Sequence, residues 1–365
     1  MRIAISTGGG DAPGLNAVIR AATLAAIRRG WEVLGIRDGF NGLLTPDKYV
    51  MSGGGIYHLN RDDVRGIGHL GGTILGSTNT GSPLEYPMQQ PDGTWVTADR
   101  TDELVGMFHE RGIDALISVG GDGSLRIANH LHQAGLRVIG VPKTIDNDLD
   151  KTTATFGFDT AVEFATDCID RVISTATSHN RVMVVEVMGR YAGWIALHAG
   201  IAGAAHAILI PEIPYDLGKV AEMIRHREER QANFSIVVVA EGAAPIGGQR
   251  SVIGKQIGQA ERLGGIGHIV AQQLGELTGK ETRTVVLGHL LRGGSPTSGD
   301  RLLGTRFGTA AVRALEEGQD GVMVALNPPV VDYVPLAEAT ATMKTVDPTC
   351  DTVVAARDLG ISFGD

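Results

Sequence analysis

The chain has 365 residues, enough for two domains of ordinary size, and its 43% hydrophobic and 20% charged content is typical of a globular protein. A net charge of −9 argues against a nucleic-acid-binding role, and no apolar run approaches the roughly 18–20 residues of a membrane span. Cys168 and Cys350 have no metal-binding spacing and indicate a reducing compartment. Because Met1 leads directly into an apolar run without a signal peptide, we expect a cytoplasmic protein.

Short apolar runs alternate with amphipathic stretches along the chain, a pattern typical of a largely parallel sheet with helices on both faces. Strands are expected at 2–6, 32–36, 115–119, 137–141, 182–187, 206–210, 235–240, 284–287 and 322–326. Helices are expected at about 15–29, 158–176 and 264–277. Residues 77–100, with several Gly and Pro, are expected to form a long irregular surface excursion.

This pattern predicts an α/β protein of two Rossmann-like lobes with mostly parallel sheets and an active site in the cleft between them. We expect one lobe to comprise residues 1–157 plus about 291–325, and the other residues 158–290 plus about 326–365.

A glycine-rich loop, residues 8–14, follows the first expected strand and opens the first expected helix. Backbone amides of such a loop approach a polyphosphate closely, and the helix N-terminus adds favourable partial charge. A tight turn without a ligand remains an alternative for this motif by itself. The glycine spacing differs from the dinucleotide fingerprint, and the second strand ends at Ile36-Arg37 without a carboxylate, which argues against hydride chemistry.

Two further elements follow neighbouring strands and carry carboxylates. In residues 120–124, Asp122 is placed to hold Mg²⁺ and Gly123 leaves room for a phosphate, although helix capping is an alternative. In residues 144–148, Asp146 and Asp148 are two positions apart, suited to a base and a metal-directed group. An Asx-rich turn explains that second segment equally well.

Basic side chains in the second half of the chain lie beside apolar strands or glycine turns. They are Arg181, Arg190, Arg283, His289 and Arg292. A single arginine at a loop tip is usually a solvated surface residue, but several in an acidic protein favour recognition of a phosphate-bearing substrate. Glu241 follows the strand at 235–240 and is placed either to accept bonds from sugar hydroxyls or simply to end the strand.

Together these segments resemble ATP-dependent 6-phosphofructokinases over roughly residues 2–310. The motifs that carry the resemblance are GGDG at 120–123, PKTIDND at 142–148, VEVMGRYAGW at 185–194 and LGHLLRGGSP at 287–296. The resemblance implies phosphoryl transfer from Mg²⁺-bound ATP to the 1-hydroxyl of fructose 6-phosphate, giving fructose 1,6-bisphosphate and ADP in glycolysis. It also implies a homodimer or homotetramer whose substrate site is shared between subunits, with no nucleic acid or membrane as partner.

The resemblance assigns the first lobe to the nucleotide and Mg²⁺ and the second to the sugar phosphate. Asp146 matches the family's catalytic base, with Asp148, Thr144 and Lys143 supporting the reaction. Asp122 matches the Mg²⁺ ligand, and the positions matching nucleotide contacts are Gly10, Gly121, Gly123, Ser124 and Phe40, the last against adenine. The positions matching sugar-phosphate contacts are Thr144, Asp146, Met188, Gly189, Arg190, Glu241, His289 and Arg292, with Arg181 and Arg283 from a neighbouring subunit.

The chain departs from the family pattern in the residues that select the phosphoryl donor. ATP users usually have two glycines where this chain has Gly123 and Lys143, as in a long subgroup with a mixed signature. Since an aspartate at position 123 would occupy the place of the nucleotide phosphate, Gly123 favours ATP. Lys143 keeps a pyrophosphate-dependent, reversible enzyme as an alternative, and Asn79 replaces an arginine that bridges both substrates in many relatives.

Two more distant alternatives are a kinase for another sugar phosphate, such as sedoheptulose 7-phosphate, and a non-catalytic sugar-phosphate-binding subunit. Leu24 and Ile173 replace arginines of the effector site found in regulated bacterial relatives, although Arg20 is retained. We therefore expect nucleotide diphosphate and phosphoenolpyruvate not to regulate this protein as they do those relatives.

Overall fold

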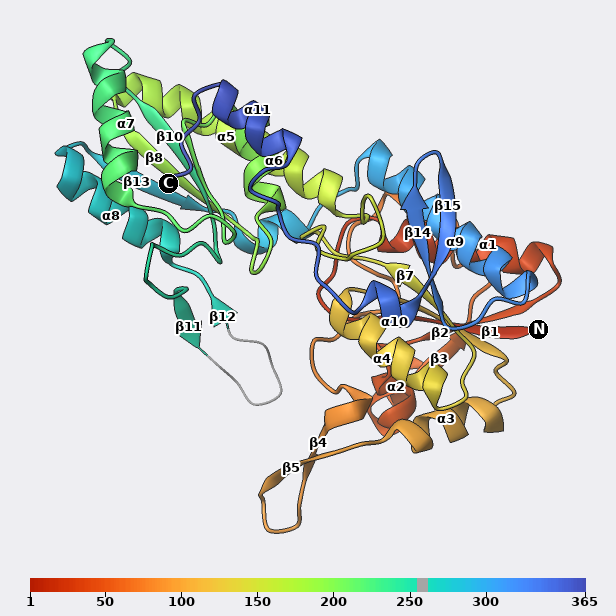
Figure 1. Ribbon diagram of the computed structural model, residues 1–365. Helices are drawn as coiled ribbons and strands as arrows, with labels where there is room; N and C mark the ends of the chain where they lie inside the picture. Colours follow the sequence, from red (N-terminus) through yellow and green to blue (C-terminus); the bar gives the residue numbers. More distant parts are fainter. Residues whose placement is uncertain (255–261) are drawn as a thin grey trace. The chain divides into compact units, whose positions relative to one another are not determined.

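The computed structural model describes residues 1–254 and 262–365, which form two compact units (Figure 1). The first unit contains Met1–Thr144, Leu149–Gly157 and Arg292–Met343. The second contains Ile145–Asp148, Phe158–Leu291 and Lys344–Asp365. The chain therefore crosses between the units several times, and both units contain segments that are distant in sequence.

A seven-stranded sheet forms the centre of the first unit, in the order β15-β14-β7-β6-β1-β2-β3. The five inner strands are parallel, and the edge strands β3 and β15 are antiparallel to their neighbours. The strands are β1 (Arg2–Thr7), β2 (Glu32–Ile36), β3 (Ile56–His58), β6 (Ala115–Gly120), β7 (Val138–Pro142), β14 (Val322–Asn327) and β15 (Val330–Pro335).

Helices cover both faces of this sheet (Figure 1). On one face lie α1 (Leu15–Arg28) and α9 (Ser298–Glu316), packed against alternate residues of β1 such as Ile3 and Ile5. On the other face, reached by Ala4, lie α2 (Asn41–Leu44), α3 (Thr101–Glu110), α4 (Asp122–Gln133) and α10 (Leu336–Ala339). Because successive side chains of a strand point to opposite faces, a continuously apolar strand such as β1 buries both.

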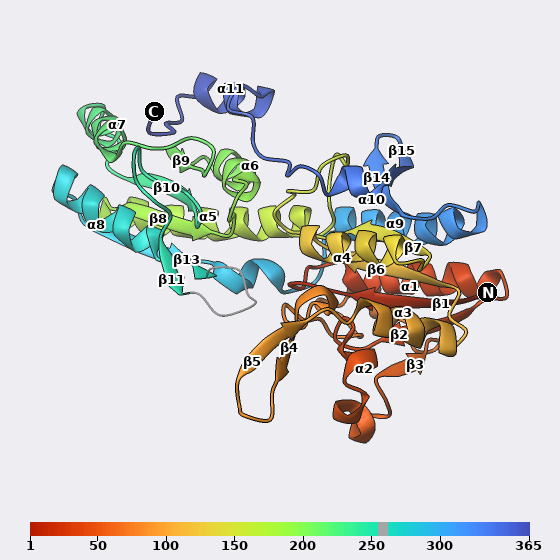
Figure 2. The ribbon, with the colours of Figure 1, turned by 60° about the horizontal axis from the view of Figure 1, so that its bottom comes forward.

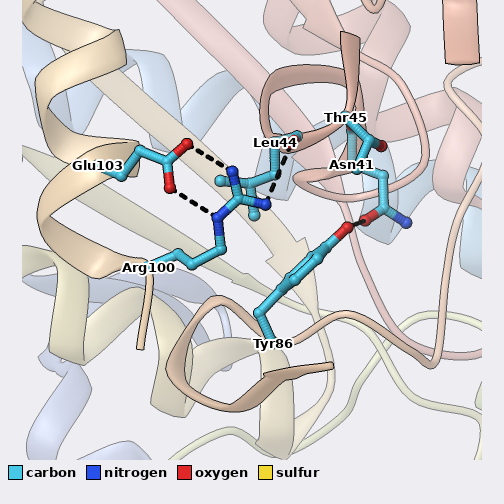
Figure 3. Close-up of polar contacts among 6 residues, drawn as sticks. All are labelled: Asn41, Leu44, Thr45, Tyr86, Arg100 and Glu103. Carbon is cyan, nitrogen blue, oxygen red and sulfur yellow. Dashed lines mark hydrogen bonds and ion pairs between the residues drawn. The ribbon is translucent and has the colours of Figure 1, made fainter. Parts of the chain in front are cut away.

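Residues 77–100 are more regular than expected. They contain a short 3₁₀ turn, η3 (Pro83–Glu85), and a hairpin of β4 (Tyr86–Gln89) and β5 (Trp95–Ala98). The base of the hairpin is fastened to α2 and α3, as Figure 3 shows. Tyr86 donates to Asn41 Oδ1 at 3.2 Å, while Arg100 donates to the Leu44 carbonyl at 3.1 Å and to Glu103 Oε2 at 2.6 Å. The bond from Arg100 lowers the pKa of Glu103.

The second unit is built on a smaller, fully parallel sheet in the order β13-β8-β10-β9. The strands are β8 (Val182–Val187), β9 (Ala207–Leu209), β10 (Ser235–Ala240) and β13 (Thr282–Val286). One face of this sheet packs on α7 (Leu217–Glu229) and α8 (Ile266–Thr278). On the other face, α5 (Phe158–His179) and α6 (Trp194–Ala202) contact strands of the sheet (Figure 2). The remaining elements of the two units are η1 (Pro46–Ser52), η2 (Ile67–His69), η4 (Gly288–Arg292), α11 (Asp351–Asp358), and the antiparallel pair β11 (Val252–Gly254) and β12 (Arg262–Leu263).

The predicted α/β fold with mostly parallel sheets is confirmed. The last expected boundary, near residue 325, is displaced to Met343, because β14 pairs with β15 and residues 326–343 stay with the first unit. The tail then joins the second unit, where Ser362 bridges to Ala207 beside β9. In the part of the chain that the structure describes, no helix is both long and apolar enough to cross a membrane.

Candidate active site

In the first unit, two glycine-containing loops meet at the carboxyl edge of the sheet. Gly8, after β1, donates its N–H to the carbonyl of Val119 in β6 at 3.0 Å. The Ser124 side chain lies between the two loops, because a Cβ added at Gly8 would be 2.8 Å from Ser124 Oγ and one added at Gly120 would be 2.2 Å from Ser124 Cβ. Neighbouring parallel strands thus bring together the motifs at 8–14 and 120–124.

Two cationic side chains flank the first of these loops. Lys143 is only 3% exposed and donates from Nζ to the carbonyl of Gly10. Arg292 donates from Nη1 to the carbonyl of Asp11 at 3.1 Å, and a Cβ on Gly10 would meet that nitrogen at 2.7 Å. A glycine loop whose carbonyls accept hydrogen bonds from a lysine and an arginine side chain is suited to binding an anionic ligand beside them.

Asp122 and Gly123 begin helix α4 directly after β6. Gly121 is the N-cap residue of α4, and no side chain forms a capping hydrogen bond there. The structure therefore does not support helix capping as the role of Asp122 or Ser124. The Asp122 carboxylate accepts from Arg126 Nε at 3.0 and 3.1 Å, one turn along the helix. No atom lies within 4 Å of a Cβ added at Gly123, so the backbone there faces open space.

The donor groups at Asp122 are compatible with Mg²⁺. Among the residues that the structure describes, no three His, Cys, Asp or Glu side chains gather into a metal-binding group. Mg²⁺ does not require one, because it is usually held by one or two carboxylates, with waters and substrate phosphates completing its shell. Asp122 is an oxygen donor with a side chain 29% exposed, and it fits that arrangement.

In the second unit, residues 145–148 form a tight loop. Asn147 is 6% exposed and has a φ of +50°, a left-handed conformation that asparagine tolerates better than most residues. Asp146 and Asp148 on either side are half-buried. Thr144, just before this loop, belongs to the first unit, where its carbonyl accepts from Thr155 Oγ1 at 2.7 Å.

The predicted sugar-phosphate residues of β8 and β10 lie together at the carboxyl edge of the second sheet. Met188, Gly189 and Arg190 follow β8, and Glu241 follows β10, its parallel neighbour. Backbone bonding continues beyond the strands, with the Glu241 N–H donating to Val187 at 2.9 Å and the next N–H to Gly189 at 3.0 Å. The sheet therefore places these four residues side by side.

Arg181 and Arg283 lie at the opposite, amino edge of the same sheet. Arg181 precedes β8, and Arg283 is near the start of β13. Both pair with Glu281, Arg181 at 2.9 Å, and the bond from Arg181 lowers the pKa of that glutamate. At about 3.3 Å per residue, the length of β8 separates these arginines from Arg190 by roughly 20 Å. Arg181 and Arg283 thus do not share one phosphate with Arg190 within this unit.

Comparison with known proteins identifies the family of this chain. The model of the family described as "Phosphofructokinase" matches residues 2–315. The chain belongs to the phosphofructokinase family. It is 54% identical to an ATP-dependent 6-phosphofructokinase of Chloroflexus aurantiacus, covering all of this chain and 98% of that protein. It is 48% identical to a pyrophosphate–fructose 6-phosphate 1-phosphotransferase of Amycolatopsis methanolica, covering 95% of this chain and 97% of that one.

Solved structures of phosphofructokinases share the fold. The phosphofructokinase of Saccharomyces cerevisiae matches with a TM-score of 0.77 and 29% identity, covering all of this chain. This chain spans 48% of the length of the yeast chain.

Three predicted contacts of this phosphofructokinase have surroundings that differ from expectation. Phe40 is 8% exposed and packs in the core with Leu43 and Tyr86, so little of its ring is open for adenine to stack on. Arg292 lies in the first unit beside Gly10, whereas His289, three residues earlier, is in the second unit and exposed. A common phosphate pocket for these last two residues stays a prediction.

Two polar partners in this phosphofructokinase were missed by sequence reasoning. Arg126 pairs with Asp122 at a spacing of four residues, which a helical reading of 122–133 would have found. Lys344 donates from Nζ to Asn147 Oδ1 at 3.0 Å, across 197 positions of sequence. No local pattern marks a contact at that separation.

Proposed function

We propose that this phosphofructokinase transfers the γ-phosphoryl group of ATP to the 1-hydroxyl of fructose 6-phosphate. The observation that carries the choice of ATP is the open space at Gly123, beside a carboxylate suited to Mg²⁺. A nucleotide places an additional phosphate and a nucleoside where pyrophosphate ends, and it therefore needs that space. The names of the Chloroflexus relatives support the same donor.

In the proposed reaction, Asp146 accepts the proton of the sugar hydroxyl as the hydroxyl attacks the transferred phosphorus. Lys143 and Arg292 supply positive charge beside the Gly10 loop, where negative charge grows in the transition state. Asp122 would hold Mg²⁺, which neutralises phosphate charge and aligns the donor. Asp148 and Thr144 orient the loop and the substrate, while Met188, Gly189, Arg190 and Glu241 hold the sugar phosphate.

Changing Asp146→Asn tests the proposed base. Because general-base catalysis contributes about 100- to 10,000-fold, we expect kcat to fall by that factor while fructose 6-phosphate still binds, as measured by isothermal calorimetry. Asp358→Asn, at an exposed carboxylate of α11, is the matched control and should retain normal turnover. Near-normal turnover of the Asp146 variant would refute the assignment.

A pyrophosphate-dependent enzyme is the second candidate, favoured by Lys143 against the glycine loop and by the names of the Amycolatopsis relatives. Initial rates with ATP and with pyrophosphate, each at saturating fructose 6-phosphate and Mg²⁺, separate the two. We expect ATP to be the better donor by at least about tenfold, and Gly123→Asp to lower ATP turnover much more than pyrophosphate turnover. The opposite order of donors would establish the second candidate.

We also propose that Arg181 and Arg283 act on the substrate of another subunit in a homodimer or homotetramer. Their position at the amino edge of the sheet, roughly 20 Å from Arg190, supports a shared site. If so, Asp146→Asn and Arg283→Ala, each nearly inactive, should complement one another when co-expressed. Random pairing in a twofold assembly restores about a quarter of wild-type sites. Mixed oligomers isolated with two affinity tags but no more active than the parents would contradict a shared site.

A further inference from the structure

The last 22 residues of the chain, Lys344–Asp365, begin against the loop that carries the proposed base. The Lys344 N–H donates to the carbonyl of Asp148 at 2.9 Å, and its Nζ donates to Asn147 Oδ1 at 3.0 Å. All of these residues belong to the second unit. One residue of the tail therefore bonds to two consecutive residues of the loop, once from the main chain and once from the side chain.

Asn147 is the residue of this loop that most needs support. Its left-handed φ of +50° is uncommon for any residue except glycine and costs free energy relative to ordinary conformations. Because Asn147 lies between Asp146 and Asp148, its backbone angles set the directions in which both carboxylates leave the chain. The ammonium bond to its buried amide stabilises that conformation.

Lys344 is itself fixed by the start of helix α6. Trp194 donates from Nε1 to the Lys344 carbonyl at 3.0 Å, and the Lys344 ammonium lies 6.0 Å from the centroid of the Trp194 ring. Two residues further, the Val346 N–H donates to Glu212 at 2.7 Å, and the same carboxylate accepts from Gly193 at 3.0 Å. The lysine is thus held at its main chain and its side chain before it reaches the loop.

We propose that Lys344 is a positioning residue for catalysis, which fixes Asn147 and through it the carboxylates of Asp146 and Asp148. This proposal rests on the proposed function, because it takes Asp146 to be the base. A misplacement of about 1 Å in a reacting group costs up to about 100-fold in rate. Loss of the lysine should therefore lower kcat. The KM for fructose 6-phosphate should change little, because it depends mainly on the proposed sugar-phosphate residues that follow β8 and β10.

The first test compares Lys344→Met, Lys344→Arg and Lys219→Met. Methionine keeps the aliphatic stem but cannot donate, so kcat should fall about 10- to 100-fold with the KM for fructose 6-phosphate within about threefold of wild type. Arginine retains a charged donor and should recover much of that loss. Lys219, exposed on α7, is the matched control for removing one lysine charge from the second unit. Wild-type kcat in Lys344→Met would overturn the proposal, as would an arginine variant no better than methionine.

The second test removes the same bond from its other end. Asn147→Gly tolerates the left-handed conformation but has no side-chain acceptor. If the bond is the cause, kcat of the double variant Lys344→Met/Asn147→Gly should match the lower of the two single variants. Multiplying losses would mean that the two residues act separately and would overturn the proposal. If circular dichroism shows that Lys344→Met folds poorly, Asn147→Gly still tests the proposal. It removes the same bond from the other end and should show the same fall in kcat.

The outcomes remain distinct from those for the proposed function. If Asp146→Asn keeps its turnover, the assignment of the base fails whatever Lys344 does. If Asp146→Asn is inactive but Lys344→Met turns over normally, the base stands and only the positioning role fails.

Discussion

At the carboxyl edges of the two sheets, glycines adjoin the predicted ligand-binding residues, but their surroundings differ. A Cβ added at Gly123, after β6, would have no atom within 4 Å. A Cβ added at Gly242, after β10, would lie 2.0 Å from the carbonyl oxygen of Arg190 and 2.9 Å from that of Gly189. The first glycine leaves space that a ligand can use, whereas the second lets two backbone segments touch. A glycine after a strand thus leaves open space beside the backbone in the first unit, whereas in the second unit it permits close contact between two backbone segments.

The largest expected effect comes from Gly242→Ala, which tests the packed side of this contrast. Because the added methyl meets backbone rather than a flexible side chain, the loops after β8 and β10 must separate. We expect the free energy of unfolding to fall by about 3 kcal/mol, as measured by urea denaturation, together with weaker fructose 6-phosphate binding.

The control for this variant is Gly106→Ala, inside helix α3, where an added Cβ meets nothing within 4 Å. It should leave stability unchanged or raise it by up to about 1 kcal/mol. A Gly242→Ala protein as stable as the control would show that the loops yield easily, and the contrast between the two edges would fail.

The dependence of the free energy of unfolding on pH tests whether the second sheet is also closely packed at its amino edge, where His206 precedes β9. Burial, with a smaller effect of Arg227, lowers the pKa of His206 to about 4, and its Nδ1 accepts from the Ile236 N–H at 2.9 Å. An unfolded histidine binds a proton near pH 6.5, so stability should fall as the pH drops from about 6.5 to 4. Allowing for partial exposure, we expect a loss of about 1–2 kcal/mol.

Urea denaturation at several pH values measures this loss. His206→Asn keeps an acceptor near the position of Nδ1 but does not titrate, and it should remove most of the slope between pH 6.5 and 4. An unchanged slope in this variant would assign the acid sensitivity to other groups.

The smallest expected effect on stability comes from Gly123→Ala, which tests the open side of the contrast. Alanine is the better helix former in the first turn of α4, so the free energy of unfolding should rise by up to about 0.5 kcal/mol. The methyl group occupies the space proposed for the nucleotide, and the KM for ATP should therefore rise several-fold. If neither stability nor the KM for ATP responds, the space at Gly123 is not used by the donor.

Much of the fold was predictable because its strands are buried on both faces and therefore appear as continuous apolar runs. The expected strands at 182–187 and 235–240 match β8 and β10 residue for residue. The hairpin of β4 and β5 was missed because Pro87 and exposed residues around it give no alternating pattern, and its anchoring depends on Arg100 contacts with α2. The run 287–296 likewise gave no sign that the boundary between the units falls within η4, between Leu291 and Arg292.

The sequence by itself identified the residues proposed to carry the chemistry: the glycine loops, Asp122, Asp146 and Lys143, which keeps both donors open as candidates. These were readable because each motif is local, and spacing within a loop limits what its backbone and side chains do. Only the tertiary structure decided which distant groups act on those motifs. Lys344 reaches Asn147 across 197 positions, and the length of β8 holds Arg181 away from Arg190. Such relations depend on how strands and helices pack, and packing joins residues whose separation along the chain carries no signal.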